Sequence, residues 1–164
     1  MSASPSDIRA QWAENHPGLD TSPMELVALL KRATGLLDRA VEPLYEGAVL
    51  TAPEVDMLVP LRHAGEPVIA RGLAERLGLS RAGVSKTLGK LERRGFVART
   101  PNPADRRAAL VTITPAGARA VDDLFPRQLA AEVELFAELG EDRERVVRAL
   151  GRLVETMEGR TGPA

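Results

Sequence analysis

The sequence predicts a mainly α-helical protein with one small β-hairpin. Helix-capping patterns recur along the chain, two short β-strand patterns stand close together, and aromatic residues make up only 3% of the 164 residues. With so few aromatic side chains, the core has to be built from Leu, Val and Ala, which favours packed helices over a large sheet. The length favours a single domain with appendages.

The helices of the first third are predicted from their starts. Ser22-Pro23-Met24-Glu25 and Thr51-Ala52-Pro53-Glu54 each place a hydroxyl residue three positions before a glutamate, with a proline in the first turn. This pattern satisfies free amides at a helix start, so helices are expected from residues 23 and 52. The first should kink or end at Pro43. A short earlier helix is expected over residues 8–15, carrying Trp12.

Residues 70–89 have the spacing of a helix-turn-helix. Ala74 lets two helices approach closely, Gly78 supplies the positive φ of a sharp turn, and Val84 fills the angle between the helices. Taken alone, this spacing also fits an ordinary corner between two helices. Residues 67–77 and 80–93 are the two expected helices.

A hairpin and two long helices complete the chain. Residues 95–100 and 109–113 read as strands joined by a polar stretch. Thr114-Pro115 then caps a helix that is expected to run to residue 140, and Glu141-Asp142 place negative charge at the start of a last helix. Long helices at both ends of a chain of this size favour a dimer in which two copies pack these helices together across a two-fold axis.

The composition excludes several classes of site. There is no cysteine, which rules out disulfides and thiol chemistry. His16 and His63 lack neighbouring ligands at metal-binding spacing, so we expect no metal and no cofactor. No phosphate-binding glycine loop or Ser/His/Asp arrangement is recognisable, so we do not expect an enzyme. No apolar run suits a membrane span or a signal peptide, and we expect a cytoplasmic protein.

Charge is concentrated in one window of the sequence. Residues 71–107 hold ten basic and three acidic residues and carry +7, whereas the rest of the chain carries −8. Such a basic block suits contact with a polyanion, above all double-stranded DNA. The alternatives are a solvated face and a non-enzymatic interaction module whose basic face meets an acidic partner.

The helix over residues 80–93 presents short or basic side chains suited to a DNA major groove, and the hairpin after it suits the neighbouring minor groove. The predicted contacts of the helix are Ser80, Arg81, Ser85, Lys86 and Lys90. Those of the hairpin are Arg99, Arg106 and Arg107, with Asp105 orienting an arginine.

These motifs resemble the MarR-type winged-helix transcription regulators over residues 23–158. The resemblance lies in Leu50–Leu58, Leu73–Ser80, Leu91–Arg99 and, most specifically, Asp105–Gly117. It implies a winged helix-turn-helix protein that binds a pseudo-palindromic operator as a homodimer, with its first and last helices at the dimer interface. It also implies a repressor that responds to a small molecule, and places Asp105 and Arg107 at the wing tip.

The added N-terminal segment is similar to a subgroup of that family that responds to urate or related small anions. Trp12, Asp56 and Arg99 match the effector-binding positions of the subgroup. Thr87 stands where the subgroup has an arginine, which leaves citrate-like and phenolic ligands open beside urate. The resulting division is residues 1–48 for dimerisation and an effector lid, 49–114 for the winged helix-turn-helix, and 115–164 for C-terminal dimerisation helices.

Overall fold

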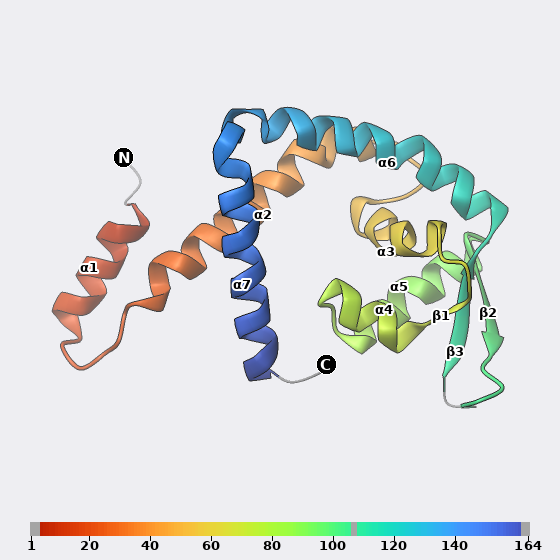
Figure 1. Cartoon of the computed structure of the whole chain (residues 1–164), viewed down its shortest axis with the longest axis horizontal. Helices are drawn as coiled ribbons and strands as arrows, with labels where there is room; N and C mark the ends of the chain where they lie inside the picture. Colours follow the sequence, from red (N-terminus) through yellow and green to blue (C-terminus); the bar gives the residue numbers. More distant parts are fainter. Residues whose placement is uncertain (1–3, 106–107, 162–164) are drawn as a thin grey trace. The chain divides into compact units, whose positions relative to one another are not determined.

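The fold is mainly α-helical with one small antiparallel sheet, which confirms the predicted class (Figure 1). It is a computed structural model that describes residues 4–105 and 108–161. The helices are α1 (Pro5–Asn15), α2 (Pro23–Tyr45), α3 (Ala52–Arg62), α4 (Ala70–Leu77), α5 (Arg81–Arg93), α6 (Pro115–Leu135) and α7 (Arg143–Thr161). The strands are β1 (Val68–Ile69), β2 (Val97–Pro101) and β3 (Ala109–Ile113), and a 3-10 segment, η1 (Ala137–Asp142), separates α6 from α7.

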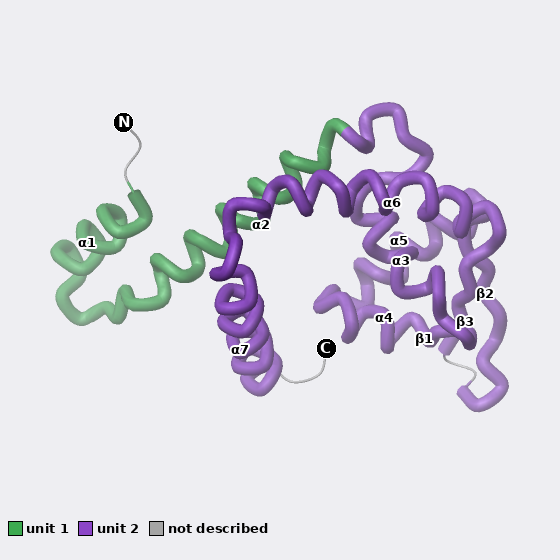
Figure 2. Tube along the Cα trace, turned by 45° about the horizontal axis from the view of Figure 1, so that its top comes forward, with its two compact units in different colours: residues 1–43 green, residues 44–164 purple. Residues whose placement is uncertain are grey.

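The chain divides into two compact units, residues 1–43 and residues 44–164 (Figure 2). In the first unit, α1 begins at Pro5 instead of residue 8 because Ser4 forms a reciprocal cap with Asp7. The Ser4 hydroxyl accepts from the Asp7 amide at 3.2 Å, and the Asp7 carboxylate accepts from the Ser4 amide at 2.9 Å. These bonds hold the pKa of Asp7 below its usual value.

The core of the second unit lies where α3, α4, α5 and the sheet meet, with α6 packed against α3 and β3. Its apolar side chains come from every one of these elements, and burying a single leucine stabilises the fold by about 1.5–3 kcal/mol. The buried set includes Leu50, Val55, Leu58, Leu73, Leu88, Leu91, Val111 and Val121.

The predicted helix-turn-helix is present as α4 and α5. Gly78 ends α4 with φ +63°, and Leu79 donates its amide hydrogen to the Ala74 carbonyl at 3.0 Å. Ala74 and Val84 are both fully buried between the helices. Ala74, Gly78 and Val84 therefore have the steric roles that their spacing predicted.

The sheet contains one strand that the sequence did not predict. Its order is β1-β3-β2, and all pairing is antiparallel. Val68 and Ile69 pair with Val111 and Leu110, so α4 begins at Ala70 and not at residue 67. Strands β2 and β3, with the segment between them, form the wing.

Gly117 allows the start of α6 to pack closely against the residues that lead into the wing. The Thr114 hydroxyl caps the helix by accepting from the Gly117 amide at 3.1 Å. A Cβ at Gly117 would lie 2.2 Å from the Phe96 carbonyl oxygen, so only glycine permits this approach. The helix ends at Leu135, and η1 occupies part of the stretch predicted to continue it to residue 140.

Candidate nucleic-acid interface

Helix α5 has one buried face and one exposed face. Val84, Leu88 and Leu91 point into the core and anchor the helix. The five residues predicted to contact DNA are all exposed: Ser80, Arg81, Ser85, Lys86 and Lys90. This split follows from the helical period, since the apolar and polar positions fall on opposite sides.

Ser80 has a definite role in the structure. Its hydroxyl accepts from the Gly83 amide at 3.1 Å and caps the start of α5. The cap fixes the start of α5 shortly after the Gly78 turn. Arg81 is exposed on the first turn of this helix. Helix N-termini also attract anions such as phosphate.

Local hydrogen bonds hold the described part of the turn that follows β2. Asn102 is buried, and its side-chain oxygen accepts from the Ala104 amide at 3.0 Å. Asp105 is exposed, and its backbone oxygen accepts from the Ala108 amide at 3.0 Å. The predicted contacts Arg106 and Arg107 lie outside the described residues.

Arg99 lies on β2 and faces α5. Its Nη2 donates to the Ser85 carbonyl at 3.1 Å, and its Nε lies 3.5 Å from a carboxylate oxygen of Glu92. Only 23% of the side chain is exposed. The guanidinium therefore joins the wing to the helix that carries the predicted DNA contacts.

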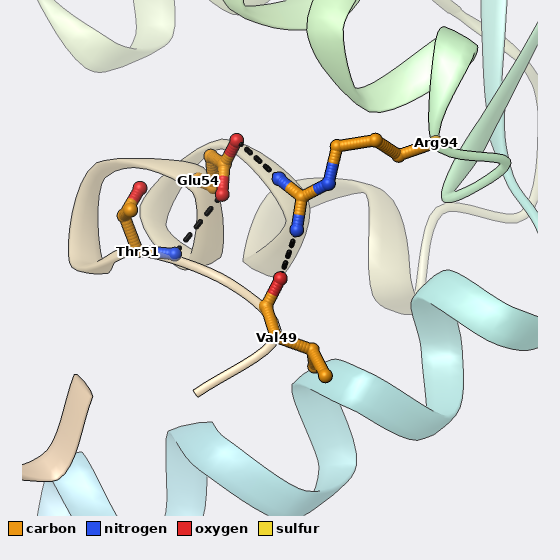
Figure 3. A network of polar contacts seen from close by, with 4 residues as sticks. All are labelled: Val49, Thr51, Glu54 and Arg94. Atoms are coloured by element: carbon orange, nitrogen blue, oxygen red, sulfur yellow. Dashed lines mark hydrogen bonds and ion pairs between the residues drawn. The ribbon is translucent and has the colours of Figure 1, made fainter. Parts of the chain in front are cut away.

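Arg94 forms a second connection, one that sequence analysis missed (Figure 3). It follows α5 directly, donates to Glu54 Oε1 at 2.8 Å and also donates to the Val49 carbonyl. The other Glu54 oxygen accepts from the Thr51 amide at 3.0 Å. Burial alone would raise the pKa of Glu54, but the Thr51 amide and the Arg94 guanidinium hold it below its usual value.

The sequence pattern pointed to only one partner of the Arg94–Glu54 pair. The capping pattern at Thr51 identified Glu54 as a helix-start residue, and the structure shows both capping bonds. Nothing in the spacing shows that Arg94, forty positions away, supplies the counter-charge.

The three predicted effector residues fall in the two units. Trp12 is 47% exposed on α1 and stacks on His16 with ring centroids 4.9 Å apart. Asp56 is exposed on α3, and Arg99 is engaged with α5 as described. Thr87 is partly buried on α5.

A polar chain lies close to Asp56. The Tyr45 hydroxyl donates to the buried Gln128 side chain, whose amide donates to Glu132 at 2.8 Å. Burial, with smaller contributions from the negative charges of Asp56 and Glu132, raises the pKa of Tyr45 to about 12. The phenol is therefore neutral and serves as a donor at neutral pH.

Comparison with known proteins finds a family model that resembles this winged-helix segment. A family model described as "MarR family" matches residues 50–108, which span α3, the helix-turn-helix and most of the wing. The segment is therefore similar to this family. The MarR-family match covers the five predicted α5 contacts and both arginine connections.

Similarity to individual transcription regulators extends over nearly the whole chain. The HTH-type transcriptional regulator PecS of Dickeya dadantii is 29% identical over 152 residues, which is 92% of each chain. The PcaV transcriptional regulator of Streptomyces coelicolor, solved with its natural ligand, is 26% identical with a TM-score of 0.63 and coverage of 95% and 98%. Sco3205 from the same organism, solved with DNA, shares the fold at a TM-score of 0.73 and 20% identity, over 88% of this chain and 91% of its own.

In the part of the chain that the structure describes, no helix is both long and apolar enough to cross a membrane.

Proposed function

We propose that the protein is a DNA-binding transcription regulator that acts as a homodimer. The observation that carries this proposal is the exposed, basic face of α5, capped at Ser80 and directly followed by the wing. A helix in the major groove with a wing over the neighbouring groove is an established way to read duplex DNA. Relatives such as PecS are transcription regulators, and Sco3205 was solved in complex with DNA.

The proposed contacts divide by groove. Side chains of α5 reach base edges and phosphates in the major groove, whereas Arg106 and Arg107 reach the minor groove, with Asp105 orienting one of them. The α5 contacts are Ser80, Arg81, Ser85, Lys86 and Lys90.

A second copy of the chain is the proposed occupant of the exposed apolar faces at its two ends. Val147, Val154 and Met157 on α7 are each more than half exposed, and Leu29 on α2 is 52% exposed. Apolar faces of this extent are costly in water and are typical of subunit interfaces. Residues 1–48 and 115–164 are therefore the proposed dimerisation regions, with a winged helix-turn-helix in residues 49–114.

The proposed regulator is a repressor that releases DNA when a small anion binds, and the resemblance assigns Trp12, Asp56 and Arg99 to effector binding. The exposed indole offers a planar stacking surface. Asp56 is a carboxylate, so the ligand needs an N–H or O–H donor beside its negative charge. PcaV, which shares this fold, was solved in complex with its natural ligand, which supports a ligand-responsive role.

Binding to duplex DNA at several salt concentrations tests the function. For a protein that neutralises DNA phosphates, the logarithm of the association constant falls linearly with the logarithm of the salt concentration. The slope is about −0.9 for each phosphate that is neutralised. We expect a steep slope and a pseudo-palindromic selected site with half-site centres roughly 10 bp apart. Binding to acidic proteins with no affinity for duplexes would favour the interaction-module alternative instead.

A further inference from the structure

We infer that Arg99 is a positioning residue that locks the recognition helix α5 to the wing strand β2, and that it does not itself contact DNA. The inference rests on the proposed DNA-binding function and assigns Arg99 a role different from the contact expected from the sequence. It concerns how the two DNA-reading parts are held in one fixed geometry.

The guanidinium of Arg99 spans two turns of α5. Its Nη2 donates to the Ser85 carbonyl at 3.1 Å, and its Nε faces Glu92 Oε2 at 3.5 Å. Ser85 and Glu92 are seven positions apart and therefore lie on the same side of the helix. One side chain thus fixes both the position of α5 along β2 and its rotation.

The environment of Arg99 favours this engaged state over contact with a phosphate. Its Nε is buried without a hydrogen-bond partner, so Glu92 is the group that compensates its charge. Leaving Glu92 and the Ser85 carbonyl to reach a phosphate would break both interactions at once. Both of these interactions have a charged donor, so a phosphate contact would have to replace two charge-assisted interactions.

Gly89 gives the guanidinium room beside the helix backbone. It lies one turn after Ser85, and a Cβ there would be in ordinary contact with Arg93 Nη1 at 3.7 Å and Arg99 Nη2 at 4.0 Å. A longer side chain at this position would compete with Arg99 for the space.

The consequence for DNA reading is geometric. Strand β2 is held in the sheet, where Arg99 pairs with Val111 of β3. Ser85 belongs to the proposed base-reading face of α5. A loosened Arg99 would let that face shift relative to the wing, which weakens contacts to base edges more than contacts to phosphates, because base readout requires closer alignment.

The test compares two duplexes: one selected by the wild-type protein from a randomised pool, and a scrambled version of it. Dissociation constants for both are measured over a range of sodium chloride concentrations with the full chain. The variants are Arg99→Lys, Arg99→Gln and Glu92→Gln. Arg71→Gln and Glu75→Gln are the matched controls, because that pair forms a 2.8 Å ion bridge on α4 instead of between α5 and β2.

We expect Arg99→Lys to weaken binding to the selected duplex about five- to tenfold while changing the scrambled duplex less than about twofold. The lysine keeps the charge, so the salt slope stays the same, but a single ammonium cannot replace the planar fork. Glu92→Gln should also weaken selective binding, although it removes a negative charge near DNA. The control variants should leave the ratio of the two affinities unchanged.

A direct phosphate contact would behave in the opposite way. Arg99→Lys would bind like wild type, Arg99→Gln would weaken both duplexes and reduce the salt slope by about 0.9, and Glu92→Gln would bind both duplexes equally well or more tightly. That result overturns the inference and leaves the proposed function intact. Failure of the wild type to bind any duplex overturns both. If the Arg99 variants do not fold, Glu92→Gln decides alone by the direction of its effect on the selected duplex.

Discussion

Arg94 and Glu54 form an ion pair of 2.8 Å that joins the end of α5 to the start of α3. The Glu54 side chain is only 9% exposed, whereas that of Arg94 is 42% exposed. A carboxylate this buried depends on its partner, because an uncompensated charge away from water is costly. The pair therefore ties α5 to the rest of the second unit.

Glu54→Gln is expected to lower the free energy of unfolding by about 1–2 kcal/mol, since the amide keeps the shape but loses the charge-assisted bonds. Arg94→Gln should cost a similar amount. The double variant should cost less than the sum of the two, which urea denaturation of all four proteins measures. Full additivity would show that the two residues do not stabilise the fold through each other.

The same pair predicts a pH dependence of stability. Because the folded-state pKa of Glu54 lies below its ordinary value of 4.5, the ionised carboxylate stabilises the folded state above that value. This contribution is lost as the pH falls through the lowered folded-state pKa. The difference in unfolding free energy between wild type and Glu54→Gln should therefore be constant near neutral pH and shrink in the acid range. A difference that stays constant into that range would contradict the assignment.

Gly117→Ala is expected to destabilise the second unit by about 1–3 kcal/mol, because the added Cβ meets the Phe96 backbone, which cannot move aside without disturbing the wing. Gly72→Ala on α4 is the matched control. Its Cβ has no heavy atom within 4 Å, so it should stabilise the helix by about 0.5–1 kcal/mol. Thermal unfolding should move the two variants in opposite directions.

Arg81→Ala is expected to weaken binding to a selected duplex by about 1–3 kcal/mol and to relax base preference at the position it contacts. Binding to a scrambled duplex should suffer less. Equal losses on both duplexes would instead make Arg81 a phosphate contact.

Trp12 provides a direct test of the effector site, because it is the only tryptophan of the chain. We expect that whichever of urate, citrate or a phenolic carboxylate releases DNA also changes tryptophan fluorescence over the same concentration range. Trp12→Phe and Asp56→Ala should blunt the release while DNA binding persists. Normal release by both variants, with unchanged fluorescence in the wild type, would place the effector elsewhere.

The sequence by itself determined those features whose causes are local. The caps at Ser80 and Thr114 and the left-handed turn at Gly78 depend on a few neighbouring residues, and the structure has all three. The division of α5 into a buried and an exposed face follows from the helical period alone. These local rules place the predicted α5 contacts on one accessible surface.

Only the tertiary structure decided which distant groups meet. Strand β1 is two residues long and exists because β3 offers it backbone partners, so no periodic pattern could reveal it. Arg94 and Arg99 resemble every other arginine of the basic window in sequence, yet one pairs with buried Glu54 and the other with Glu92 and a helix carbonyl. Their partners come from other elements, because pairing of charges depends on distance in space and not on separation along the chain.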